Sequence, residues 1–148
     1  MSKATLALLI DGLLPALLFG ISGVFQKTAA RAGISTGPYL IAIGAVVLLA
    51  GIAVTAVQGD TTATREGVAW ACGYGVLWSA GIGCIVLALA RYDANISQLV
   101  PVYNLNTLVA VAVGMAVLGE WRDVVPWRVA AGAVLAVAGG VLAATATR

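Results

Sequence analysis

Asp11 is the residue of this sequence best placed to do chemistry, because it is the one charged side chain between residues 4 and 25. An ionised carboxylate in hydrocarbon costs about 3 kcal/mol, so it is protonated, paired or in contact with water. Burial favours the protonated form of a carboxylate, which suits a group that binds and releases protons near neutral pH. We expect Asp11 to couple proton movement to a second event. In the alternative, it snorkels to the near surface or hydrogen-bonds another helix.

The same apolar stretch carries a polar stripe. With about 100° of rotation per helical residue, Asp11, Pro15, Ser22 and Gln26 fall within about 60° of one another. Pro15 has no N–H to donate to the Asp11 carbonyl, so we expect a local kink and an unbonded acceptor beside the carboxylate. We expect the stripe to face other helices, with Ser22 and Gln26 as ligand contacts.

Aromatic side chains recur at a spacing of four further along the chain, at Trp70, Tyr74 and Trp78. On a helix they span about 80° of one face. Trp70 is placed to anchor at the headgroup level, whereas Trp78 lies at the centre of its apolar stretch. With Tyr74 one turn away, Trp78 predicts an aromatic wall for a cation or a flat organic ligand. Packing against glycines of a neighbouring helix is an equally compatible interpretation.

Uncharged polar residues mark the stretch from residue 94 to residue 118. Gln98, Tyr103 and Asn106 share one helical face, and Pro101 interrupts the backbone ladder between them. Amides and a phenol can orient a polar ligand at a small burial cost. They can equally join two helices by hydrogen bonds of about 0.6–2 kcal/mol each.

The last apolar stretch has small residues where the others have polar ones. Gly132, Ala136 and Gly140 repeat every four residues, and such rows let two backbones approach closely. We expect this row to be a packing or dimer seam. We expect Lys27 and Arg91, at the ends of other stretches, to reach the lipid headgroups and to have no ligand role.

Composition shows what kind of protein holds these residues. Of 148 residues, 61% are hydrophobic and 9% are charged, with a mean hydropathy of +1.03, where a soluble domain carries about 25% charge. The chain is therefore expected to be a membrane protein. Its net charge of +2 argues against a nucleic-acid partner, and the lack of histidine excludes His-based catalysis and His-ligated metal. We expect no enzymatic activity, no metal and no cofactor.

Hydropathy divides the chain into five apolar segments with short connections, each long enough to cross a bilayer. We therefore expect an all-α membrane protein with a single transmembrane domain covering residues 1–148. The expected helices cover about residues 4–25, 37–57, 67–90, 94–118 and 124–144.

The basic residues beside the bilayer are divided evenly between its two sides. Five spans place the termini on opposite sides, and lysines and arginines normally mark the cytoplasmic one. An even division is expected either when the first helix or the insertion machinery sets the orientation, or when the chain inserts both ways. The N-terminal side has Lys3, Arg65, Arg122 and Arg128, and the other side has Lys27, Arg31, Arg91 and Arg148.

Several short motifs, taken in order, resemble the drug/metabolite transporter superfamily and its EamA-type unit of five helices. The resemblance covers nearly the whole chain. The resemblance includes a proline inside the fourth helix and the sequence Leu-Gly-Glu at the end of that helix. The motifs are Phe19–Lys27, Leu87–Tyr92, Asn95–Tyr103, Leu118–Glu120, Ala131–Leu135 and Gly139–Gly140.

The resemblance implies a half-size transporter. Typical members carry two such units, the second inverted relative to the first, whereas this sequence holds one. The family architecture would then require two copies in an antiparallel homodimer, in which each copy supplies one half of an inverted repeat. The balanced charges fit such dual topology. The resemblance also implies a multi-pass protein of the plasma (inner) membrane of a bacterium or archaeon.

Two narrower likenesses differ in what they imply. A carboxylate in the first helix with aromatics in the third is similar to the small multidrug resistance family, although that family has Glu and four helices. Leu14–Leu17 with Gly37–Tyr39 is similar to bacterial glucose/ribose uptake proteins. Neither likeness names a substrate.

Three functions are compatible with these observations. The first is proton-coupled export of a small organic cation by an antiparallel homodimer, with lipid, proton, substrate and a second copy as partners. The second is transport of a neutral metabolite or sugar, with Asp11 structural. The third is a non-transporting membrane subunit of a hetero-oligomer.

Overall fold

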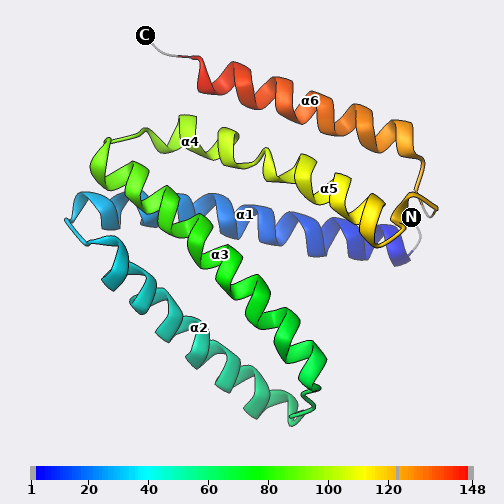
Figure 1. The fold of residues 1–148 in the computed structure, drawn as a ribbon, viewed down its shortest axis with the longest axis horizontal. Coiled ribbons are helices and arrows are strands. Elements are labelled where there is room, and N and C mark those ends of the chain that lie inside the picture. Colours follow the sequence, from blue (N-terminus) through cyan, green and yellow to red (C-terminus); the bar gives the residue numbers. More distant parts are fainter. Residues whose placement is uncertain (1–2, 123, 147–148) are drawn as a thin grey trace. The chain divides into compact units, whose positions relative to one another are not determined.

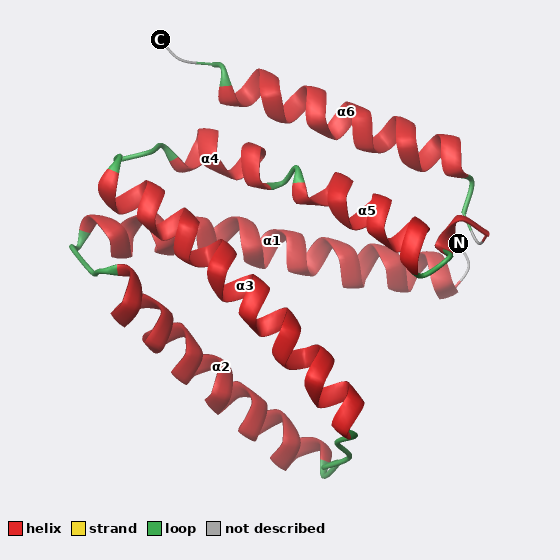
Figure 2. Cartoon of the chain, viewed as in Figure 1, coloured by secondary structure: helices red, strands yellow, loops and turns green. Residues whose placement is uncertain are grey.

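The computed structural model describes residues 3–122 and 124–146, and it describes side chains from residue 11 onward with Glu120 excepted. The charges counted at Lys3 and Arg148 lie outside the described side chains. The described part is helical, without strands, and its helices are joined by short loops (Figures 1 and 2). The helices are α1 (Lys3–Arg31), α2 (Thr36–Gln58), α3 (Arg65–Arg91), α4 (Ile96–Tyr103), α5 (Asn106–Val117) and α6 (Pro126–Ala144), with a 3-10 turn, η1 (Glu120–Arg122), before α6.

The prediction of five apolar helical segments is confirmed in the described part of the chain, since each is long and apolar enough to cross a membrane, and α4 and α5 together form the fourth, Ile96–Val117. The helix limits agree with the prediction to within two residues, apart from two differences. α1 continues to Arg31, six residues beyond the expected end. The expected end marked where the apolar stretch stops, and the helix continues through the more polar residues after Phe25. The fourth span is two helices rather than one, and it is interrupted at Asn104 and Leu105.

The chain divides into two compact units, Met1–Asp93 and Ala94–Arg148. The first unit contains α1, α2 and α3, and α3 packs against both of the others. Gly83 of α3 marks the contact with α2: a Cβ at Gly83 would lie 3.7 Å from Thr36 and 3.8 Å from Leu40. We call this end of the unit, where α1 ends, α2 begins and α3 ends, the junction.

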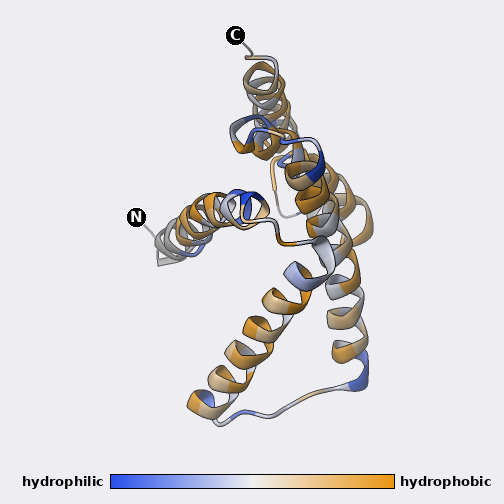
Figure 3. Ribbon diagram, turned by 90° about the vertical axis from the view of Figure 1, so that its left-hand side faces the viewer, coloured by the Kyte–Doolittle hydropathy of each residue, from blue (hydrophilic) through white to orange (hydrophobic). Residues whose placement is uncertain are grey.

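The helices separate away from the junction. α2 and α3 are far apart at their other end, where residues 59–64 join them (Figure 3). Glycines nearer the start of α3, such as Gly73 and Gly75, have open space within 4 Å of the position that a Cβ would take, and α2 has no buried residue. Among the side chains described from residue 11 onward, the buried apolar residues of this unit are Ala30, Val86 and Leu89, which belong to the last turns of α1 and α3. The packing of the first unit is therefore concentrated at the junction.

The loop between α2 and α3 has well-defined ends. Gly59 adopts a left-handed conformation (φ 69°), and its N–H donates to the Thr55 carbonyl (2.9 Å), which terminates α2 as glycine commonly does. Thr64 begins α3, because its hydroxyl oxygen accepts a hydrogen bond from the Gly67 N–H (3.1 Å). These two local hydrogen bonds define where α2 ends and where α3 begins.

The second unit is built on the packing of α6 against α4, with a smaller contact to α5. Gly140 of α6 lies against the backbone of Pro101, and a Cβ there would be 3.0 Å from the Pro101 carbonyl oxygen. Near the ends of the two helices, Gln98 Nε2 donates to the Ala144 carbonyl at 3.4 Å. Small residues in α6 thus allow close backbone packing within this unit.

Candidate functional site

Asp11 is exposed on α1 and is the first residue of the candidate membrane span Asp11–Arg31. The other residues of the predicted polar stripe differ in how exposed they are. Ser22 is exposed and donates its hydroxyl to the Phe19 carbonyl (2.8 Å), Pro15 is half-buried, and Gln26 is buried. The stripe therefore turns toward neighbouring helices only near the junction. Pro15 lies within α1 without ending it.

The aromatic face of α3 is also exposed. Tyr74 is 69% exposed, whereas Trp78 is 37% exposed, so most of the Trp78 surface is covered and part of it remains accessible. Along its helix, Asp11 lies about 24 Å from Lys27, while Tyr74 and Trp78 lie about 26 and 20 Å from Arg91. Since Lys27 and Arg91 are both at the junction, the carboxylate and the two rings are at similar distances from it.

The first unit does not bring these groups into contact. No hydrogen bond, ion pair or ring contact joins Asp11 to Tyr74 or Trp78 among the described residues, because α1 and α3 have separated at this distance from the junction. A ligand contacting both helices would have to lie between them, or a further chain would have to supply the contact. The predicted site is thus present as two exposed faces.

The second unit contains the predicted amide face. Gln98 and Tyr103 are half-buried, and Asn106 is exposed. The helix break at Asn104 and Leu105 separates Asn106 from the other two. Across the break the Leu105 N–H donates to the Val102 carbonyl (3.1 Å) and the Thr107 N–H donates to the Asn104 carbonyl (3.0 Å), so tight turns replace the α-helical pattern. Pro101 lies three residues before this break.

The small-residue row of α6 has two surroundings. Gly140 is buried against α4, whereas Gly132 and Ala136 are exposed. α6 also buries Ala133, which directly follows Gly132 and lies on the same side of the helix as Gly140. Packing inside the unit therefore uses one edge of the predicted row. The role of Gly132 and Ala136 as a dimer seam stays a prediction.

The residue pair that sequence analysis missed is Lys27 with Asp93. Lys27 is only 7% exposed, and its Nζ lies 2.5 Å from Asp93 Oδ1, whereas the Asp93 side chain is 86% exposed. The expectation that Lys27 extends to the lipid headgroups is therefore wrong for this structure. The two residues are 66 positions apart, so no local pattern could have paired them. The signal that could have suggested this pair is a basic residue near the end of one span together with an acidic residue just after the end of another.

The surroundings of Asp93 explain its ionisation. The hydrogen bond from Lys27, then the charge of Lys27 and more weakly that of Arg31, hold the pKa of the Asp93 carboxyl below its usual range. Gln26 is buried beside Lys27 and hydrogen-bonds Tyr39 of α2. Polar groups of α1, of α2 and of the loop after α3 thus meet at the junction.

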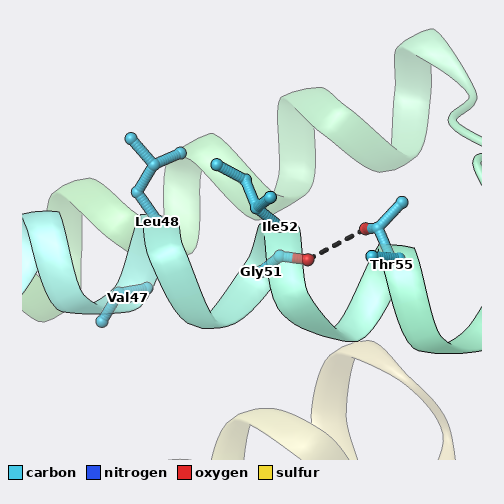
Figure 4. Close-up of a pocket in the computed structure, with 6 residues that line it drawn as sticks. Val47, Leu48, Gly51, Ile52 and Thr55 are labelled. Carbon is cyan, nitrogen blue, oxygen red and sulfur yellow. Dashed lines mark hydrogen bonds between the residues drawn. The ribbon is translucent and has the colours of Figure 1, made fainter.

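α2 has a shallow hollow away from these residues. It is lined by one helix alone, and in Figure 4 Leu48 and Ile52 project to the same side while Thr55 donates its hydroxyl to the Gly51 carbonyl (2.9 Å). The lining is almost wholly apolar, and it holds no titratable side chain. This surface is suited to lipid contact and has no group for chemistry.

Two tryptophans of the second unit lie near arginines. The guanidinium of Arg122 is 5.2 Å from the Trp121 ring centre, and that of Arg128 is 5.5 Å from the Trp127 ring centre. Such pairs, exposed beside the start of α6, are typical of residues that anchor a helix at a membrane–water interface.

Comparison with known proteins adds no identity. No protein-family model matches the chain, and no curated protein and no solved structure is significantly similar to it. Among the described residues no group of His, Cys, Asp and Glu side chains could hold a metal ion. The described residues form five helical segments long and apolar enough to cross a membrane, which fits a multi-pass membrane protein, and the first of them carries an exposed carboxylate, Asp11.

Proposed function

We propose that this protein is a secondary transporter that exports a small organic cation in exchange for protons, working as an antiparallel homodimer. The observation that carries the proposal is the exposed carboxylate of Asp11 on a membrane-spanning helix. Ionisable residues at membrane depth almost always face a bundle interior or a water-filled path, because exposure to lipid is costly. The unit of α1, α2 and α3 does not cover Asp11, so the cover comes from outside that unit.

A second, inverted copy is the cover that best fits the charges. It would bring a second Asp11 toward the membrane midplane, and the balanced basic residues allow both orientations. The two carboxylates would bind either protons or one cation, so loading a proton releases the substrate. Inward proton flow then drives the cation outward.

The aromatic face of α3 supports a cationic substrate. Tyr74 and Trp78 are at a distance from the junction similar to that of Asp11, so a ligand at this depth would have a carboxylate on one side and two rings on the other. Ring faces attract organic cations, most strongly where water is excluded. The pairing of a carboxylate with aromatic faces favours a cation over an anion.

Transport by purified protein in lipid vesicles tests this function. With a pH gradient across the vesicle, we expect uptake of tetraphenylphosphonium to depend on the gradient and to be abolished by Asp11→Asn. Asp60→Asn is the matched control, because Asp60 is a fully exposed carboxylate in the loop after α2. Gradient-driven uptake by Asp11→Asn at the rate of the control would refute proton coupling through Asp11.

A neutral metabolite or sugar is the second candidate substrate, favoured by the broken fourth span. Near the centre of that span, Asn106 is exposed and Tyr103 is half-buried, next to backbone that has left the α-helical pattern. Irregular backbone at membrane depth is tolerated where it lines a cavity or is covered by protein. Since a ligand that binds only the folded state raises Tm, a panel of cations and sugars separates the two candidates by thermal shift.

A further inference from the structure

Lys27 is a buried cation whose partner lies in a loop. Lys27 belongs to the helical part of α1 and is 7% exposed, and Asp93 follows the end of α3. A buried charge is stable only while it is paired or solvated, because desolvation penalises it. The Asp93 carboxylate supplies that pairing, with 2.5 Å between Lys27 Nζ and Asp93 Oδ1.

The two halves of the pair differ in how easily they can move. Lys27 is held by its helix among buried neighbours, Gln26 and Ala30 included. Asp93 is exposed and has a positive φ of 46°, which a residue with a side chain adopts only at some cost. Asp93 is therefore the half that water can reach, and its release would let its backbone leave this costly conformation.

The pair lies where the first unit is closed. It ties the last turns of α1 to the end of α3, and the contact of Gln26 with Tyr39 brings in the start of α2. Beyond the junction these helices separate (Figure 3). Water entering the junction would solvate Lys27 and replace Asp93, so hydration and breaking of the ion pair are coupled events.

We propose that the Lys27–Asp93 ion pair is a latch for one face of the transport path: the face stays closed while Asp93 pairs with Lys27, and it opens when Asp93 leaves and the Lys27 cation draws in water. In the antiparallel dimer, on which this inference rests, the second copy places an identical latch at the opposite face. Alternating access then consists of one latch open and the other closed, followed by their exchange. The exposed Asp93 side is the one that opens.

The test measures water access at the junction without any substrate. Ala30, which is 8% exposed, is replaced by cysteine in a chain in which Cys72 and Cys84 are changed to alanine. The Ala30→Cys protein is placed in lipid vesicles and labelled with a membrane-impermeant maleimide. The rate of labelling reports how often the junction is open.

Two substitutions are expected to change this rate in opposite directions. Asp93→Asn leaves Lys27 buried without its carboxylate, so the junction opens to water and labelling rises about tenfold. Lys27→Met replaces the cation with an apolar side chain of similar length, so the junction stays closed and labelling falls below that of the parent. A merely structural salt bridge predicts instead that both substitutions loosen the junction and raise labelling, and that result would overturn the latch.

The outcomes separate the latch from the proposed function. If labelling changes in opposite directions but Asp11→Asn transports normally, the latch stands and proton coupling fails. If neither substitution changes labelling while Asp11→Asn abolishes transport, the latch fails and the transport function stands.

The side from which the label enters is a second test. Half of the Asp93→Asn molecules should label from outside and half only from inside, and labelling from one side alone would refute a latch at each face. Should Asp93→Asn lose its helical circular dichroism, faster labelling in Lys27→Met than in the parent would still refute the latch.

Discussion

Gly140 of α6 faces the backbone carbonyl of Pro101 in α4, and a Cβ at Gly140 would lie 3.0 Å from that oxygen. The neighbour is backbone rather than a flexible side chain, so it cannot easily move aside. The Leu105 N–H, four residues after Pro101, donates to Val102 instead, which leaves the Pro101 carbonyl turned toward α6. The close packing of α6 on α4 therefore depends on a hydrogen atom at Gly140.

Gly140→Ala is expected to destabilise the second unit. The added methyl group forces α6 away from α4, and overpacking of this kind costs about 1–3 kcal/mol in the free energy of unfolding. Gly139→Ala is the matched control, because nothing lies within 4 Å of a Cβ there and alanine favours helix. Unfolding measured in a detergent that dissociates oligomers should separate the two variants, and equal stabilities would contradict the packing.

The five spans could be predicted from sequence because hydropathy directly reports which stretches tolerate hydrocarbon. Helix ends are less predictable. Hydropathy marks where the apolar stretch ends near Phe25, but α1 continues as helix to Arg31. In the fourth span Pro101 signals an interruption, but the break comes after it, at Asn104 and Leu105, whereas the hydrogen bond that a proline removes lies before it.

The candidate site was predictable only in part. A lone carboxylate among apolar residues stands out in any sequence, and so does a row of aromatics. Sequence spacing describes one helix at a time, so it placed Gly132 and Gly140 in one row without showing that only Gly140 packs on α4. The Lys27–Asp93 pair depends on which helices meet at the junction, and that information is tertiary.

The contribution of Asp93 to stability should be lost in acid. Its pKa is below the ordinary 3.8 in the folded protein, first because Lys27 hydrogen-bonds it and then because Lys27 is positively charged. A carboxylate with a lowered folded pKa stabilises the protein at all pH values above its unfolded pKa, and this contribution disappears as the pH falls through the folded pKa. The difference in Tm between the parent and Asp93→Asn should be constant from pH 7 to about pH 5 and shrink below about pH 4.

The same titration in a Lys27→Met background is the control for this prediction. Without the Lys27 ammonium, Asp93 loses its hydrogen bond and its main charge partner, so Asp93→Asn should change Tm little at any pH. A pH-dependent difference of the same size in both backgrounds would show that Asp93 is stabilised by something other than Lys27.

The exposed part of the α6 row should matter for association of two copies. Gly132 has nothing within 4 Å of a Cβ, so Gly132→Leu should leave the folded chain intact but keep a second helix at a distance. We expect dimer dissociation in lipid to become about tenfold more favourable, measured by energy transfer between labelled copies. Ala138→Leu is the control, since Ala138 is exposed about 120° away around the helix. Equal effects of the two variants would exclude a seam at Gly132.

Two loop positions can test whether the chain inserts in both orientations. Ser35 and Thr62 lie in the loops at opposite ends of α2, and both are exposed. Ser35 precedes α2 without a side-chain capping hydrogen bond. At Thr62 a cysteine keeps the backbone N–H that donates to Asp60 Oδ1 (2.8 Å) and loses only the hydroxyl hydrogen bond to that carboxylate, so the exposed loop is expected to be retained. Each variant is made without Cys72 and Cys84 and labelled in intact cells with an impermeant maleimide.

Dual topology predicts comparable labelled and protected fractions at both positions, because each orientation exposes one of the two loops. A fixed orientation predicts full labelling at one position and full protection at the other. The balanced basic residues favour the first result, since neither side has the excess that normally holds a loop in the cytoplasm. The second result would refute a dimer of two inverted copies of this chain, and the cover for Asp11 would then have to come from a different, oppositely oriented partner chain.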